Sequence, residues 1–294
     1  MALQELKLDK DVQQKKALRY IEIDKKIGNI FDNFLADLES RISRGKEDPN
    51  IICRDTLLDL YLGKEYNYDE IIESSKASLA LKTSVANFDS RNITLEAEYY
   101  DNIDEKKFHA VKPYIWLWMM FDRSPAGRNL HLGFPMRRLL AKKIFKKCGK
   151  NFKAFQDIEL SFGYNISVGD NVVVHRKVLL DDRGEIIIED GASISDYVNI
   201  YSHSHSIFDA GDVTLGKTII HKGARLTYHS TVLSGVRVGQ DSMVGAMGLV
   251  TRDVRNYHIN VGIPAKSVRV KEGVCLDICT DKTCKTKGKP HSKH

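Results

Sequence analysis

Six consecutive hexads, IHKGAR, LTYHST, VLSGVR, VGQDSM, VGAMGL and VTRDVR, fill residues 220–255. Their first positions are all aliphatic: Ile220, Leu226, Val232, Val238, Val244 and Val250. Their fifth positions are mostly small: Ala224, Ser230, Val236, Ser242, Gly248 and Val254. A six-residue period fits neither the 3.6-residue period of a helix nor the two-residue period of a strand, and it is typical of a parallel β-helix. Each coil of that fold buries its aliphatic residues only against neighbouring coils, so stability is built by stacking.

The same step extends upstream of residue 220. Val168, Val174 and Leu180 keep it, and Ile188, Ile194 and Ile200 resume it after a slip of two residues. The sequence therefore predicts a mainly β protein with a β-helix over residues 156–271.

The part before the repeat has a helical pattern. Apolar residues at three- and four-residue steps predict a helix over 11–46, and further helices are expected over 54–62 and over 68–82, the last capped by Asn67. The aromatic run at 114–121 is predicted to be buried core, and the segment 134–150 to form a helix with Pro135 near its start. Met136, Leu140 and Ile144 line one side of that helix, and lysines and arginines cover the rest.

A chain of 294 residues exceeds one small core and suggests more than one domain. We divide it into an α-helical N-terminal domain of unknown role (1–130), a basic lead-in helix and linker (131–155), the β-helix domain (156–271) and a basic, flexible tail (272–294). The longest apolar run is too short to span a membrane, and the N-terminus lacks the apolar core of a signal peptide, so a cytoplasmic protein is expected.

The net charge of +6 is unevenly distributed: residues 111–155 hold 11 Lys and Arg against one Asp. Nucleic-acid binding has no support beyond this charge. The basic segment 136–147 has three interpretations: it covers the open end of the β-helix, contacts anionic lipid at a membrane surface, or attracts a phosphorylated acceptor. We favour the first, because the segment lies immediately before the first coil.

The five cysteines are Cys53, Cys148, Cys275, Cys279 and Cys284. An odd number without an export signal favours reduced thiols. The last three, with His291 and His294, match no standard zinc spacing, so no metal is expected and the role of the tail stays open.

Four segments resemble the hexapeptide-repeat acyltransferases, nearest to the maltose and galactoside O-acetyltransferase branch. FGYNISVGDNV (162–172) resembles the entry coils of that branch, and IYSHSH (200–205) resembles its catalytic coil. VGAMGLVTRDV (244–254) and NVGIPAKSVRV (260–270) are similar to its last coil and the following strand. The resemblance covers roughly 135–271 and implies a left-handed β-helix, a homotrimer and an acetyl-CoA-dependent transferase.

The resemblance also implies a catalytic residue. His205 aligns with the histidine that ends a coil, and residues 206–219 would form the excursion loop beside the cleft between two subunits. Imidazole can accept the proton of an attacking hydroxyl, because its ordinary pKa is about 6.5. His203, His175 and Asp209 are the candidate acceptor contacts, and the acceptor is expected to be a saccharide or a related small molecule.

The late coils carry the implied CoA site, where small residues allow close approach and cations suit the phosphates. The candidates are Gly245, Ala246, Thr251, Arg252, Lys266 and Arg269. The chain departs from the branch near the acceptor: Arg225, Leu226 and Thr227 replace a Trp-Ile-Gly, and VVVHRKV (172–178) replaces an asparagine-rich stretch.

Three rival functions remain beside O-acetylation. The first is an N-acyltransferase acting on an amino sugar or a nucleotide sugar, which the same fold supports. The second is a non-catalytic β-helix that serves as an assembly scaffold. A γ-carbonic-anhydrase-type zinc enzyme is disfavoured, because the spacing of His203, His205, His221 and His229 does not fit its three-histidine site.

Overall fold

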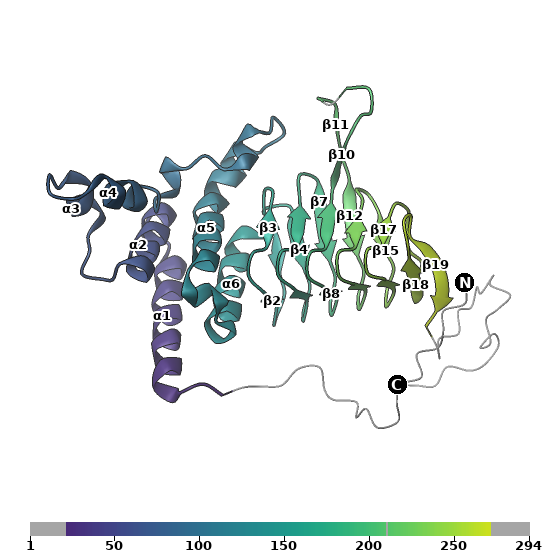
Figure 1. The fold of residues 1–294 in the computed structure, drawn as a ribbon, viewed down its shortest axis with the longest axis horizontal. Helices are drawn as coiled ribbons and strands as arrows, with labels where there is room; N and C mark the ends of the chain where they lie inside the picture. Colours follow the sequence, from purple (N-terminus) through teal and green to yellow (C-terminus); the bar gives the residue numbers. More distant parts are fainter. Residues whose placement is uncertain (1–21, 210, 272–294) are drawn as a thin grey trace.

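The computed structural model describes residues 22–209 and 211–271, with helices first and a β-helix after them (Figure 1). Residues 11–21 of the helix predicted over 11–46, and the cysteine-bearing tail, lie outside these residues. The helical elements are α1 (Lys25–Arg44), α2 (Pro49–Tyr61), α3 (Tyr68–Glu73), α4 (Leu79–Ala86), η1 (Ser90–Asn92), η2 (Glu96–Tyr99), α5 (Glu105–Arg123), η3 (Pro125–Arg128) and α6 (Leu130–Ile144).

Several predicted helix bounds differ from the structure, because capping residues start the helices at other positions. Residues 22–24 are not helical, because the Asp24 carboxylate accepts from the backbone N–H groups of Lys26 and Ile27 and starts α1 there. Asn67 caps α3 as predicted. The predicted helix over 68–82 is two helices, since Ser78 caps a second one, α4. α2 also begins earlier than expected, with Pro49 in its first turn after Asp48.

The β-helix is built from short strands on three faces, which we call A, B and C. Face A holds β1 (Lys147–Cys148), β4 (Ile166–Val168), β7 (Glu185–Ile188), β12 (Lys217–Ile220) and β15 (Arg237–Val238). Face B holds β2 (Lys153–Ala154), β5 (Val173–Val174), β8 (Ser193–Ile194), β13 (Arg225–Leu226), β16 (Met243–Val244), β18 (His258–Val261) and β19 (Lys266–Val270). Face C holds β3 (Glu159–Leu160), β6 (Leu179–Asp181), β9 (Asn199–Tyr201), β14 (Thr231–Val232) and β17 (Leu249–Val250).

The strand register confirms the hexad prediction. Neighbouring strands on each face are parallel, except that β19 returns antiparallel to β18. Val168, Ile188, Ile220 and Val238 stack in one column on face A. The first-position residues of the six hexads are at most 1% exposed, and the fifth-position residues are buried too. The repeat thus sets which side chains form the core.

The fourth position of the first five hexads has a role that the sequence pattern did not reveal. At the corners between faces, Gly223, His229, Gly235, Asp241 and Met247 take left-handed backbone conformations with φ between 51° and 79°. Non-glycine residues adopt this region rarely. The tight corner therefore depends on backbone geometry at position four as well as on the small residue at position five.

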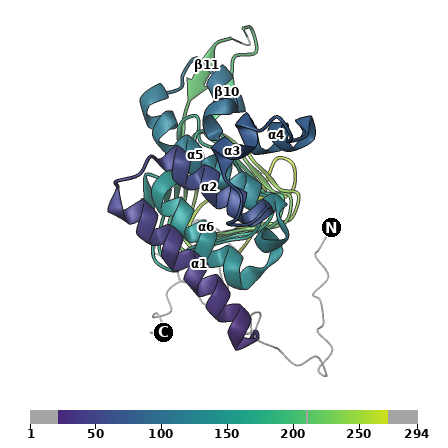
Figure 2. The same ribbon diagram turned by 90° about the vertical axis from the view of Figure 1, so that its left-hand side faces the viewer.

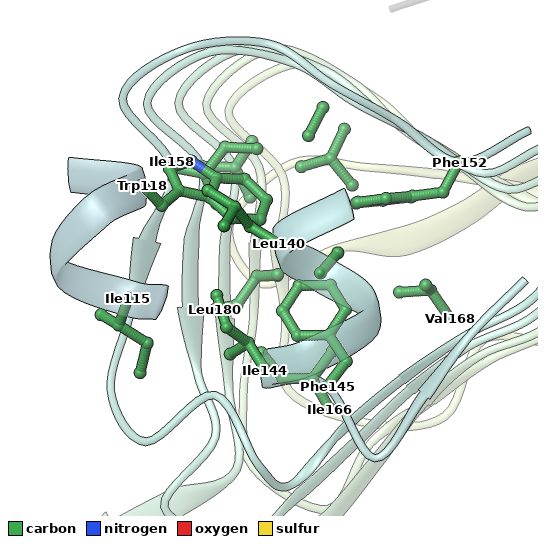
Figure 3. Close-up of a cluster of buried hydrophobic side chains, with 14 of the residues drawn as sticks. Ile115, Trp118, Leu140, Ile144, Phe145, Phe152, Ile158, Ile166, Val168 and Leu180 are labelled. Atoms are coloured by element: carbon green, nitrogen blue, oxygen red, sulfur yellow. The ribbon is translucent and has the colours of Figure 1, made fainter. Parts of the chain in front are cut away.

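Helix α6 covers the open end of the β-helix, as we favoured for the basic segment (Figures 1 and 2). Leu140 and Ile144 lie among side chains of the first coils, including Phe152, Ile166 and Leu180 (Figure 3). The Phe145 ring lies 6.2 Å from that of Trp118 and 5.8 Å from that of Phe152. The apolar cross-section that the first coil would expose is thereby buried.

Two expectations about this segment need correction. Strand β1 begins at Lys147, so the β-helix starts inside the segment assigned to a lead-in helix and linker. Arg137 is not on the basic surface of α6: it is fully buried, and its guanidinium lies 2.7 Å from the carboxylate of Asp122 in α5. The aromatic run of α5 is buried as predicted, apart from the half-buried Met119 and Met120.

We expect Ile188→Val to lower the free energy of unfolding by about 1 kcal/mol, because it removes one methylene from a fully packed column. Ile187, whose side chain is half-buried on the outside of the same strand, provides the matched control. Urea unfolding of the two variants measures the difference. Equal losses for Ile188→Val and Ile187→Val would contradict the inward assignment of the hexad residues.

Candidate active site

A β-hairpin leaves the β-helix after β9 and carries both histidines (Figure 1). Its arms are β10 (His203–His205) and β11 (Val213–Leu215), which pair antiparallel with His203 opposite Leu215 and His205 opposite Val213. The excursion thus begins before His203 and ends before Lys217, instead of spanning 206–219 as expected. His205 lies on the arm of the excursion and not at the end of a coil.

The base of the hairpin is fixed by hydrogen bonds at Ser202. Its buried hydroxyl donates to the carbonyl of Asp181 at 2.6 Å and accepts from the Gly184 N–H at 2.9 Å. The Ser202 carbonyl accepts from Gly216 at 2.6 Å. A Cβ atom at Gly184 would collide with the carbonyl oxygen of Gly216, so a glycine is required at this point of the preceding coil, which contacts the base of the hairpin. The hairpin therefore projects from a rigid base.

The two histidines lie on one face of the hairpin, because alternate residues of a strand point to the same side. Their ring centroids are 5.1 Å apart and the rings are nearly perpendicular, at 85°. His203 is mostly covered, with a side chain 14% exposed, whereas His205 is exposed. The more accessible imidazole is thus supported by a less accessible one.

Asp181, at the end of β6, is the partner that the sequence pattern missed. Its Oδ2 lies 2.8 Å from Nδ1 of His203, and its Oδ1 accepts from the Ser161 hydroxyl at 3.2 Å. The approach to His203 does not have the alignment of a regular hydrogen bond, so we describe it as an electrostatic contact. A buried carboxylate at Nδ1 favours a proton on that nitrogen and holds the ring in place. The only sequence signal was the acidic pair after Leu180, at the slip in the repeat.

Neighbouring Asp182 is fully buried and serves the turn before β4. Its carboxylate accepts from the backbone N–H groups of Phe162 at 2.7 Å and Asn165 at 3.1 Å. Burial raises the pKa of Asp182 to about 6, although these backbone donors act in the opposite direction.

This pKa predicts a pH dependence of stability. An unfolded aspartate titrates near a pKa of about 3.9. Between about pH 4 and pH 6 the folded chain therefore holds more protons at this site than the unfolded chain, and stability falls as pH rises. We expect the wild type to lose stability relative to Asp182→Asn across this window, measured by urea unfolding at several pH values. A difference that does not vary with pH would refute the raised pKa.

Two other candidate acceptor contacts lie away from the histidine pair within one subunit. His175 follows β5, at the corner between faces B and C, where its ring stacks on Phe155 at 4.5 Å. Asp209 lies in the turn between the hairpin arms, where its carboxylate accepts from the Gly211 N–H at 2.8 Å. The structure does not bring either residue together with His203 and His205.

The candidate CoA residues gather at the far end of the β-helix in three places. Gly245 and Ala246 form the corner after β16, where a Cβ atom on Gly245 would come within 2.7 Å of Val261. Thr251 and Arg252 are exposed after β17. They lie at the corner that follows face C, and the hairpin leaves the same corner two coils earlier, after β9. Lys266 and Arg269 are exposed on β19, the returning edge strand. Small residues and cations thus lie near one another on the last coils.

The described part of the chain has neither a metal-binding cluster nor a helix that could span a membrane. Residues 22–209 and 211–271 contain no group of three or more His, Cys, Asp or Glu side chains placed to hold a metal ion. Over the same residues, no helix combines the length and the apolar character needed to cross a bilayer.

Comparison with known proteins relates this chain to acetyltransferases. A Staphylococcus aureus protein with a provisional acetyltransferase name is 29% identical over 142 residues, which are 45% of this chain and 69% of that protein. The galactoside O-acetyltransferase of Escherichia coli is 24% identical over 137 residues, 45% of this chain and 68% of the enzyme. No protein-family model matches the chain.

Solved structures share the fold. A maltose O-acetyltransferase from Clostridium difficile superimposes with a TM-score of 0.52 at 24% identity, covering 59% of this chain and 92% of that one. A hexapeptide-repeat acetyltransferase from Vibrio cholerae, solved with acetyl-CoA, gives a TM-score of 0.50 at 21% identity, covering 62% and 97%. The predicted left-handed β-helix and the resemblance to this group of enzymes are confirmed.

Proposed function

We propose that this chain, an acyltransferase of the hexapeptide-repeat type, moves the acetyl group of acetyl-CoA to a hydroxyl of a saccharide-like acceptor. The observation that carries the proposal is the pair His203 and His205 on a hairpin that leaves the β-helix, with Asp181 behind His203. An exposed imidazole backed by an oriented one suits proton transfer at an open site.

His205 acts as the general base in this mechanism. Its imidazole takes the proton of the acceptor hydroxyl while the oxygen attacks the thioester carbonyl carbon. A new C–O bond forms and the carbonyl oxygen becomes an oxyanion, which backbone N–H donors stabilise. The intermediate collapses as the C–S bond breaks, and the imidazolium returns its proton to the departing CoA sulfur. No covalent acyl-enzyme is needed, so no cysteine takes part.

His203 and Asp181 position the base. The Asp181 carboxylate holds the His203 ring in place, and the perpendicular His203 ring limits the orientations open to His205. His203 can also contact the acceptor from this position, because both side chains lie on the same face of the hairpin.

Acetyl-CoA is the proposed donor. Gly245 and Ala246 let the pantetheine arm approach the backbone, and Thr251, Arg252, Lys266 and Arg269 provide a hydroxyl and cations for its phosphates and polar groups. The proposed active form is a homotrimer, in which a neighbouring subunit completes the cleft and brings in residues such as His175 and Asp209. The use of acetyl-CoA fits a cytoplasmic setting. Contact of residues 136–147 with a membrane surface is not part of the proposal, since α6 covers the β-helix end.

The test is thiol release from acetyl-CoA over a panel of neutral sugars (including maltose and a methyl galactoside), amino sugars and nucleotide sugars, with product analysis by mass spectrometry and NMR. Acceptor-dependent release with an O-acetyl product supports the proposal. An N-acetyl product transfers support to the amino-sugar alternative. No release and no acetyl-CoA binding would leave the assembly scaffold as the better account.

A further inference from the structure

The helical domain contains a pocket of its own, in addition to the one that it encloses with face C of the β-helix. Its volume is about 310 Å³, within the range of about 300–1,000 Å³ that is typical of small-molecule sites. It lies among α2, η1, η2 and α5 (α2 and α5 are labelled in Figure 1). All of its lining residues precede the β-helix, and they include Arg91, Ile93, Thr94, Glu98, His109 and Lys112.

Lys112 is the buried cation of this pocket. Its side chain is 8% exposed, and its ammonium group donates to the Ile93 carbonyl at 2.6 Å and to Oε1 of Glu98 at 2.9 Å. An ammonium group has three N–H donors, and the described residues provide partners for two of them. A buried donor that stays unpaired costs about 1–3 kcal/mol. A ligand that accepts the third N–H would remove this cost.

Glu98 is the one carboxylate among the described residues that line the pocket, and both of its oxygens are occupied. Oε1 accepts from Lys112, and Oε2 accepts from the Leu95 N–H at 2.7 Å. Two cations, Arg91 and Lys112, thus line the pocket against one carboxylate. A ligand in this space meets more donors than acceptors.

Arg91 and His109 supply further donors. Arg91 directs Nε and Nη2 at the Asp89 carboxylate, at 2.9 Å and 2.6 Å, whereas its Nη1 lies 3.5 Å from Asp48, which is too long for a good hydrogen bond. His109 precedes Lys112 by one turn of α5, so both side chains lie on one side of that helix. Because His109 is exposed and Lys112 is buried, nitrogen donors are present both at the rim of the pocket and in its interior.

These donors suit a phosphoryl group better than a carboxylate. A carboxylate is matched by the fork of an arginine, and Arg91 already gives its fork to Asp89. A phosphoryl group can instead accept single donors from several side chains, including lysine. We infer that this pocket binds a small phosphate monoester, with the phosphoryl group at Lys112, Arg91 and His109. Its organic part lies against the half-buried Ile93. This site is independent of the proposed transferase reaction and gives the helical domain a ligand of its own.

Calorimetric titration of the full chain with phenyl phosphate, benzoate and inorganic phosphate tests the inference. Phenyl phosphate is expected to bind most tightly, because benzoate lacks the phosphoryl group and inorganic phosphate lacks the organic part. Lys112→Met removes the ammonium group, and Thr94→Trp fills the pocket from its exposed rim. Each is expected to weaken binding of phenyl phosphate by about tenfold or more, the usual effect of losing one charged hydrogen bond or its space. Lys64→Met is the matched control, because Lys64 pairs with Asp59 but is 80% exposed and lies outside the pocket.

The outcomes separate the pocket from the ligand class. Thr94→Trp changes an exposed residue, so it decides the question even if Lys112→Met does not fold. Benzoate binding as tightly as phenyl phosphate would reject the phosphoryl group, and inorganic phosphate binding as tightly would reject the monoester.

The candidate CoA cations could also attract a phosphate, so Lys266→Ala is titrated in parallel. Phenyl phosphate binding that Lys266→Ala abolishes and Thr94→Trp leaves intact would place the ester on the late coils and overturn the pocket assignment. Absence of phenyl phosphate binding to the wild type would overturn the inference, whatever the result of the thiol-release assay. Binding that is lost only in the two pocket variants would support it, even for a chain that transfers no acetyl group.

Discussion

Replacing His205 by alanine is expected to reduce kcat for acetyl transfer by about 10²- to 10⁴-fold, the usual contribution of a general base. The hydroxyl of the acceptor would then lose its proton only to water. The candidate CoA residues lie on later coils and are unchanged by the substitution, so affinity for acetyl-CoA is expected to stay at the wild-type value. Steady-state thiol release and calorimetric binding of acetyl-CoA measure the two effects separately.

His221→Ala is the matched control for this prediction. His221 lies after β12, at another corner of the β-helix, with its Nδ1 3.2 Å from the carboxylate of Glu189. Its loss leaves kcat unchanged. Turnover that survives in His205→Ala but falls in His203→Ala would move the role of base to His203, the residue that Asp181 contacts.

Replacing Arg137 by leucine is expected to lower the free energy of unfolding by about 3–5 kcal/mol, the usual cost of removing one partner of a buried ion pair. The guanidinium donates to the Asp122 carboxylate, to the carbonyl of Gly127 and to the carbonyl of Ala154 in β2. It therefore joins α5, η3 and the first coil. Without it the buried Asp122 loses its cation, and two carbonyl oxygens lose a donor.

Arg128→Leu is the matched control, because Arg128 also pairs with an aspartate but has a side chain 55% exposed. A surface pair of this kind contributes at most about 1 kcal/mol. The double variant Arg137→Leu with Asp122→Leu should recover only part of the loss, since Asp122 also accepts from the Trp118 indole and the Asp157 N–H. Thermal and urea unfolding give the comparison. Equal losses for Arg137→Leu and Arg128→Leu would refute the structural role of the buried pair.

The β-helix could be predicted from sequence because its repeat is local. Every hexad makes the same contact with the hexad one coil away, so Ile188 or Val244 can be assigned to the core from its place in the period. The helical domain has no such repeat. The helix bounds predicted for it were partly wrong. The apolar pattern continues past Asp24 and Ser78, but these residues cap helices and so fix where α1 and α4 begin.

The candidate site could be predicted only in part. His203 and His205 were found because they stand where the period breaks. Asp181 was missed, because the repeat slips by two residues after Leu180. The period therefore does not predict that Asp181 pairs with Tyr201, which lies two residues before His203. The assignments of His205 as base and of the late-coil residues to CoA remain predictions.

The sequence alone determined the scaffold: six-residue spacing of aliphatic side chains admits one kind of buried core, whatever the rest of the chain does. Only the tertiary structure decided what that scaffold carries. It buried Arg137 in an ion pair, brought Asp181 to His203, and enclosed a pocket between the helical domain and face C. These contacts join residues that are not related by the six-residue repeat. They therefore depend on how helices pack on the β-helix and on where the hairpin leaves the coil.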